Sequence, residues 1–176
     1  DLKAGNQRFV DGNLTHRDYL AQASATAAGG QYPKAAILGC VDSRVPPEII
    51  FDQGIGDVFV GRVAGNVEDV NLVGSMEFAT KVAGSKIVVI LGHTACGAIK
   101  GAADGVELGN LTELLNEFDE PIARADAATD GEASSSNVEF LNLAIEENVR
   151  KTIADILEDS PVMVEMVESG DLLIVG

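Results

Sequence analysis

The fold and chemistry of this chain are decided by the stretch Ala35-Ala36-Ile37-Leu38-Gly39-Cys40-Val41-Asp42-Ser43-Arg44. A second stretch has the same design, Ile87-Val88-Val89-Ile90-Leu91-Gly92-His93-Thr94-Ala95-Cys96. In both, an apolar run leads directly into reactive side chains, and short runs of this kind are typical of buried parallel strands. Sites in such sheets form beyond the carboxyl ends of the strands, so we expect the two groups of side chains to meet in space.

The spacing of these side chains suits a metal ion. In an extended backbone Cys40, Asp42 and Arg44 point to the same side. A turn, or the first turn of a helix, brings His93 and Cys96 together. Two thiolates and one imidazole suit Zn²⁺, and three protein ligands with a fourth position left for water are typical of a catalytic site. Asp42 either fills that fourth position or lies beside it.

Each of these residues also has a plainer interpretation. A single buried cysteine is commonly a small core side chain, and a histidine after a strand is commonly a structural group with satisfied hydrogen bonds. The chain has only two cysteines, however, and both lie at expected strand ends. One is beside Asp42 and Arg44 and the other is three residues from His93, which favours a shared zinc site.

Length and composition indicate one domain, residues 1–176, with a sizeable core, since 46% of the residues are hydrophobic. The formal charge is −16, from 28 acidic and 12 basic residues. Such a surface repels nucleic acid and anionic membranes and would suit a saline environment. No stretch is long enough for a transmembrane helix.

The chain opens inside an expected helix and stops at an expected strand, so we expect it to be clipped at both ends. We expect a cytoplasmic protein, with the periplasm as the alternative.

Alternating patterns predict an α/β fold with a central, mainly parallel sheet flanked by helices. The polar segments 11–33 and 124–137 are expected to be loops, the second of them acidic. Gly54-Ile55-Gly56 leads into a strand and lacks a third glycine, so it does not predict a dinucleotide site. Strands are expected near 35–40, 57–60, 86–91 and 171–175, and helices near 1–10, from 46, and near 69–83, 97–103, 108–118 and 138–158.

Four motifs, in this order and spacing, resemble the β-class carbonic anhydrases over essentially the whole chain. They are Cys40-x-Asp42-Ser43-Arg44 with Val45-Pro46, Phe59-Val60-x-Arg62, Ala64-Gly65-Asn66, and Gly92-His93-x-x-Cys96-Gly97.

The resemblance implies a role for each matching residue. Cys40, His93 and Cys96 would bind zinc, and Asp42 and Arg44 would form the Asp–Arg dyad of the site. The substrate pocket would involve Gln31, Phe59, Ala64, Phe78 and Gly97. In the family some of these groups come from the neighbouring subunit, so we expect a homodimer or a higher homo-oligomer.

The resemblance also implies hydration of carbon dioxide to bicarbonate and a proton by metal-bound hydroxide. Zinc lowers the pKa of bound water to about 7. Arg44 would hold Asp42 ionised and off the metal, so that Asp42 orients the hydroxide towards substrate. In a closed state Asp42 would instead be the fourth ligand. Family members with that switch typically carry tryptophan where this chain has Ile37, so we expect an open site near neutral pH.

Two other functions remain open from the sequence. Relatives with the same fold and ligands hydrolyse carbon disulfide or carbonyl sulfide. A zinc-stabilised, non-catalytic oligomer is the other alternative, although it would need none of Asp42, Arg44 and Gln31. No proton shuttle is assigned; His16 lies away from the motifs and is expected to be a solvated surface residue.

Overall fold

The computed structural model describes residues 1–176, and at least one helix lies between each strand and the next along the chain. The strands are β1 (Ala35–Gly39), β2 (Val58–Arg62), β3 (Ile87–Leu91) and β4 (Leu173–Val175). The helices are α1 (Leu2–Val10), α2 (Tyr19–Gly29), α3 (Pro47–Ile50), α4 (Val70–Glu77), α5 (Gly97–Ala103), α6 (Asn110–Asn116), α7 (Asp119–Ala128), α8 (Val138–Asp159) and α9 (Pro161–Glu168). A 3₁₀ turn, η1 (Ala64–Asn66), and a π-helical turn, η2 (Phe78–Val82), complete the set. No helix has the length and apolar character needed to cross a membrane.

The strands form one sheet in the order β2-β1-β3-β4, and every neighbouring pair is parallel. All five residues of β1 are buried. The register places Gly39 of β1 beside Leu91 of β3 and Arg62 of β2, so these three strands end at the same level. The predicted parallel sheet is therefore confirmed, and the residues that follow β1 and β3 emerge at one edge.

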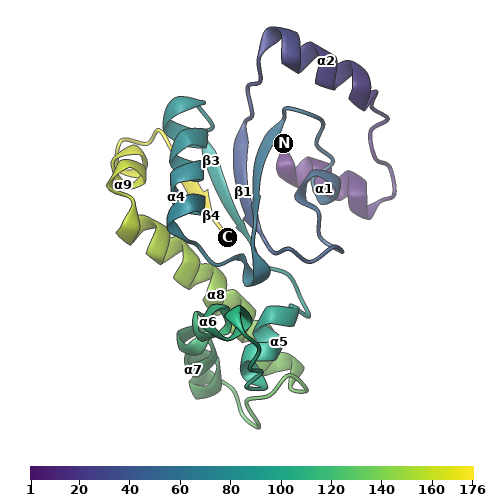
Figure 1. Ribbon diagram of the computed structural model, residues 1–176. Helices are drawn as coiled ribbons and strands as arrows, with labels where there is room; N and C mark the ends of the chain where they lie inside the picture. The colour runs from purple at the N-terminus through teal and green to yellow at the C-terminus, as the bar shows by residue number, and fades with distance from the viewer.

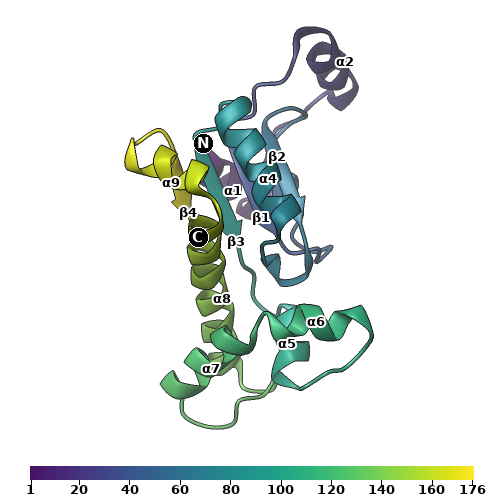
Figure 2. The same cartoon turned by 60° about the vertical axis from the view of Figure 1, so that its left-hand side comes forward.

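Helices cover the sheet and also gather beyond its carboxyl edge (Figures 1 and 2). One apolar cluster packs α4, η2, α9 and the C-terminal part of α8 against Leu38, Val88 and Ile90 of the sheet. A second cluster lies where α5, α6 and α7 gather beside the N-terminal part of α8 (Figure 2), and it includes Cys40 and Cys96. The 22 residues of α8 contribute to both clusters, so this helix connects the two halves of the core.

The structure corrects three parts of the sequence prediction. α2 lies within 11–33, where a loop is expected; its alanine-rich sequence favours a helix, but it buries no residue and so shows no apolar face. α7 continues to Ala128, so the expected acidic loop 124–137 begins only at Thr129. α9 is not predicted: Ser160 caps it, and Pro161 ends α8 yet suits the first turn of a new helix.

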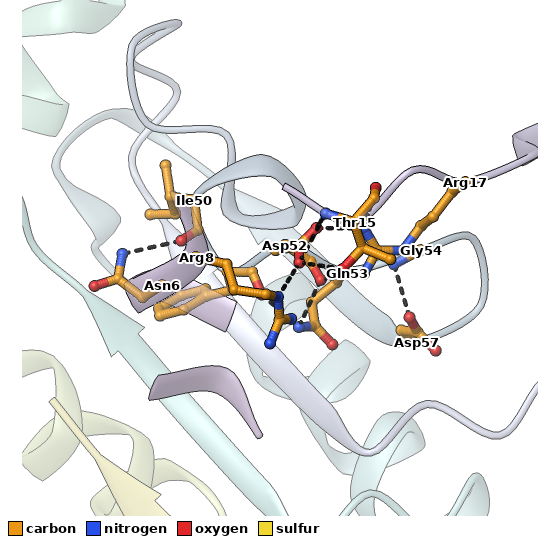
Figure 3. A network of polar contacts seen from close by, with 10 residues as sticks. Asn6, Arg8, Thr15, Arg17, Ile50, Asp52, Gln53, Gly54 and Asp57 are labelled. Carbon is orange, nitrogen blue, oxygen red and sulfur yellow. Dashed lines mark hydrogen bonds and ion pairs between the residues drawn. The ribbon is translucent and has the colours of Figure 1, made fainter. Parts of the chain in front are cut away.

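The N-terminal segment is tied to the rest of the chain by the carboxylate of Asp52 (Figure 3). Asp52 follows α3 with a φ of 48°, and its side chain is 1% exposed. Arg8 and Arg17 donate to its two oxygens, and Oγ1 of Thr15 donates at 2.8 Å. The hydrogen bond from Arg17, with those from Arg8 and Thr15, holds the pKa of Asp52 well below its usual value. This carboxylate anchors a segment whose helix α1 buries only Gly5.

Replacing Asp52 with Asn should lower the melting temperature at pH 7, because both arginines lose their charged partner. A carboxyl group with a lowered pKa stabilises the fold above the ordinary pKa of about 4, and the contribution is lost as the pH falls further. The difference from wild type should therefore shrink between pH 7 and pH 3, as followed by circular dichroism. The control is Asp11→Asn, which removes an exposed acid from the same segment. Equal melting temperatures for both variants at pH 7 would contradict this role.

Candidate metal centre

The segments that follow β1 and β3 meet at the carboxyl edge of the sheet. Cys40 comes directly after β1, His93 lies two residues beyond β3, and Cys96 immediately precedes α5. The two Sγ atoms and a ring nitrogen of His93 all lie within 4.8 Å of one another. The structure thus brings together the three residues that the sequence predicts as metal ligands.

These donor atoms are buried and available for a ligand. Cys40 and Cys96 are 4% and 2% exposed and form no disulfide. Nδ1 of His93 lies 3.0 Å from the carbonyl oxygen of Thr94, a contact that assigns the ring proton to Nδ1. Nε2 then carries a lone pair, and it is buried without a hydrogen-bond partner. Buried polar atoms normally have partners, so this nitrogen beside two sulfur atoms fits a cation that prefers nitrogen and sulfur.

Asp42 lies beside this cluster and is held by Arg44. Its Oδ1 accepts from the backbone nitrogen and from Nε of Arg44, both at 2.9 Å, and its Oδ2 accepts from Nη2 at 2.6 Å. Oδ2 is also 4.0 Å from Nε2 of His93. The hydrogen bonds from Arg44 hold the pKa of Asp42 well below its usual range. Because Nη2 of Arg44 also donates to the carbonyl of Ala95 at 3.3 Å, one guanidinium connects both loops of the site.

Arg62 and Gly65 position Cys40 from the end of β2. Nε of Arg62 donates to the carbonyl oxygen of Cys40 at 2.8 Å, and its Nη2 donates to that of Asp42 at 2.6 Å. The N–H of Gly65 donates to Sγ of Cys40 at 3.3 Å. Gly65 has a φ of 70°, and a Cβ there would lie 2.3 Å from the ring of Phe118. Arg62 and Gly65 are motif positions in the sequence, but their contacts with Cys40 are known only from the fold.

Two residues of the predicted substrate pocket lie at this centre. Ala64 opens η1 immediately before Gly65, and Gly97 opens α5 immediately after Cys96. Gly97 is exposed, and a Cβ there would meet nothing within 4 Å, so the backbone borders open space.

The other three predicted pocket residues lie elsewhere in the single chain. Gln31 is exposed and precedes β1, at the opposite end of that strand from Cys40. Phe59 of β2 pairs in register with Ala36, and four strand residues correspond to about 13 Å between that level and Cys40. The rings of Phe59 and Phe78 meet edge to face, with centroids 6.0 Å apart. One chain therefore does not bring these side chains to its own cysteines.

Comparison with known proteins gives the family. A family model described as carbonic anhydrase matches residues 35–176, which include all three candidate ligands. The chain belongs to the carbonic anhydrase family. Its named relatives include carbonic anhydrase 2 of Mycobacterium tuberculosis, which is 39% identical over 176 residues, 99% of this chain and 83% of that protein.

Solved structures place the chain in the β class of the carbonic anhydrases. A β-carbonic anhydrase of Aspergillus fumigatus matches with a TM-score of 0.75 and 31% identity, over 89% of this chain and 74% of that one. One of two tetrameric β-carbonic anhydrases of Sordaria macrospora matches with a TM-score of 0.72 and 30% identity, over 88% and 83% of the two chains. The resemblance found in the motifs is confirmed, and the protein is an enzyme of this family.

The two thiols of this carbonic anhydrase differ in acidity. A hydrogen bond from Cys96 lowers the pKa of Cys40 to about 4, and the same contact, together with burial, raises the pKa of Cys96. A divalent cation would stabilise both sulfurs as thiolates, which is the form that binds metal. The donor set thus fits a metal ion on chemical as well as geometric grounds.

Proposed function

We propose that this protein catalyses the reversible hydration of carbon dioxide to bicarbonate and a proton, with zinc held by Cys40, His93 and Cys96. The observation that carries the proposal is the convergence of these donors beside the Asp42–Arg44 pair, in a chain of the carbonic anhydrase family. Bound there, zinc would act as a Lewis acid and lower the pKa of a water molecule at its open position to about 7.

Asp42 would orient the water that attacks substrate. An ionised carboxylate only accepts hydrogen bonds, so Asp42 would accept one from this water and leave an oxygen lone pair directed towards carbon dioxide. Arg44 binds both carboxylate oxygens, which keeps Asp42 ionised. The same pairing holds Asp42 beside the three candidate ligands, so that it does not bind the metal itself. The dyad therefore fixes the direction of attack.

We propose that a second copy of this chain completes the substrate pocket. Phe78 is 52% exposed, and with Phe59 it lines an apolar hollow between β2 and α4. β2 lies at an edge of the sheet, and an exposed apolar surface beside such an edge suits a contact between copies. A two-fold contact there would bring Gln31, Phe59 and Phe78 of one copy to the metal centre of the other.

Replacing Asp42 with Ala should lower kcat/KM for carbon dioxide about 100-fold, because the attacking water loses its oriented hydrogen bond. Stopped-flow hydration measures the rate, and metal analysis of the same samples should show that zinc is retained. Asp126→Ala, which removes an exposed acid from α7, is the control and should keep the wild-type rate. Hydration by the zinc-loaded wild type no faster than in buffer would contradict the proposed function, and carbon disulfide would be the next substrate to test.

The shared pocket predicts complementation between two inactive variants. Asp42→Ala and Gln31→Ala chains are purified separately and then refolded together. In a mixed dimer, one site combines intact Asp42 from one chain with intact Gln31 from the other. Random mixing should therefore restore about a quarter of the wild-type activity. No recovery beyond the sum of the two separate variants would show that Gln31 serves the metal centre of its own chain.

A further inference from the structure

We infer that Asn148 is a positioning residue of the metal centre: from α8 it holds Gly65 so that the N–H of Gly65 points at Sγ of Cys40. The inference rests on the proposed metal centre and adds to it a residue outside both the ligand set and the Asp–Arg dyad.

Two consecutive hydrogen bonds connect Asn148 to the sulfur. Nδ2 of Asn148 donates to the carbonyl oxygen of Gly65 at 2.7 Å, and the N–H of Gly65 donates to Sγ of Cys40 at 3.3 Å. Asn148 is 2% exposed and lies midway along α8, between the two apolar clusters that this helix joins. A single glycine therefore links the long helix to a candidate metal ligand.

Gly65 needs such a support because there is little free space around its Cα and because it has no side chain to make contacts of its own. Its φ of 70° belongs to the left-handed region, and the turn is closed by a bond from the nitrogen of Asn66 to the carbonyl of Val63 at 3.1 Å. A Cβ on Gly65 would lie 2.3 Å from Phe118 and 3.3 Å from Ala98, so these side chains limit movement on that side. Asn148 fixes the carbonyl oxygen of Gly65. The N–H of Gly65 belongs to the preceding peptide group, and its direction is set by that anchor together with the close packing around the Cα.

Core packing alone does not explain an asparagine at this place. Its neighbours on the buried side of α8 include Ala144, Ile145 and Ile156, which fill space with apolar groups. Oδ1 of Asn148 is buried without a hydrogen-bond partner, which is unfavourable for stability. The favourable contact is the directed bond from Nδ2 to Gly65, and that bond leads to the metal centre.

The bond from Gly65 would make the metal a stronger Lewis acid. Two thiolates together cancel the charge of a divalent ion, which weakens its effect on bound water. An N–H donated to one thiolate withdraws electron density from that sulfur and leaves more positive charge on the metal. Asn148 would thus act on the reaction through Gly65 and Cys40, without touching substrate.

The experiment uses the full chain loaded with Co²⁺, whose thiolate-to-metal charge-transfer band reports on the sulfur ligands. Asn148→Ala and Asn148→Leu both remove the donor, and the second keeps most of the buried volume. Both variants should shift the band to lower energy and weaken Co²⁺ binding about tenfold. The matched control is Thr152→Val: Thr152 lies one turn further along α8, is 2% exposed, and donates to the carbonyl of Asn66 at 3.3 Å. Its loss should lower the melting temperature without moving the band.

Each outcome bears on a definite claim. An unchanged band and affinity in a folded Asn148 variant would overturn the inference, and so would an equal shift in Thr152→Val. A wild type without any thiolate charge-transfer band would overturn the proposed metal centre itself. Should neither Asn148 variant fold, wild type loaded with an NMR-active cadmium isotope gives the test. Coupling from the Gly65 amide proton to cadmium, together with coupling between Nδ2 of Asn148 and the Gly65 carbonyl carbon, supports the inference, and the absence of either contradicts it.

Discussion

The chemistry of this protein depends on the parallel pairing of β1 with β3. The register sets Gly39 beside Leu91, so Cys40 follows one strand at the level where Gly92 and His93 follow the other. A slip of one residue would turn every side chain of a strand to the opposite face. Burial of β1 on both faces and of the centre of β3 prevents such a slip. The same apolar residues that build the core therefore bring the three candidate metal ligands together.

The end of β2 provides the second support of the centre. Arg62 binds the carbonyls on either side of Val41, and η1 follows it with a glycine whose N–H meets the sulfur of Cys40. α8 then holds the Gly65 carbonyl of η1 through Asn148. Because α8 also contributes to both apolar clusters, the packing of the whole domain fixes the position of one candidate ligand. Arg44 supplies the corresponding link between the two loops, through Asp42 and the carbonyl of Ala95.

Much of this arrangement can be predicted from the sequence, because apolar runs that end in reactive side chains reveal both the strands and the site. The sequence fails where burial gives no pattern. α2 buries no residue, and the small, acidic residues at the end of α7 have the composition of a loop. The sequence therefore predicts neither α2 nor the end of α7 as helix. The contact between Gly65 and Asn148 spans 83 residues and has no sequence signal. Gln31, Phe59 and Phe78 lie away from the cysteines of their own chain, and the sequence of one chain cannot show which residues of a second copy complete the proposed pocket.

The most direct test is a crystal structure of the zinc-loaded protein near pH 8, with the metal located by its anomalous scattering. We predict a zinc ion bound by Sγ of Cys40, Nε2 of His93 and Sγ of Cys96, with a solvent molecule as the fourth ligand and Asp42 still paired with Arg44. Zinc at any other place would contradict the open catalytic centre proposed for this enzyme. So would an Asp42 carboxylate that has left Arg44 and binds zinc itself.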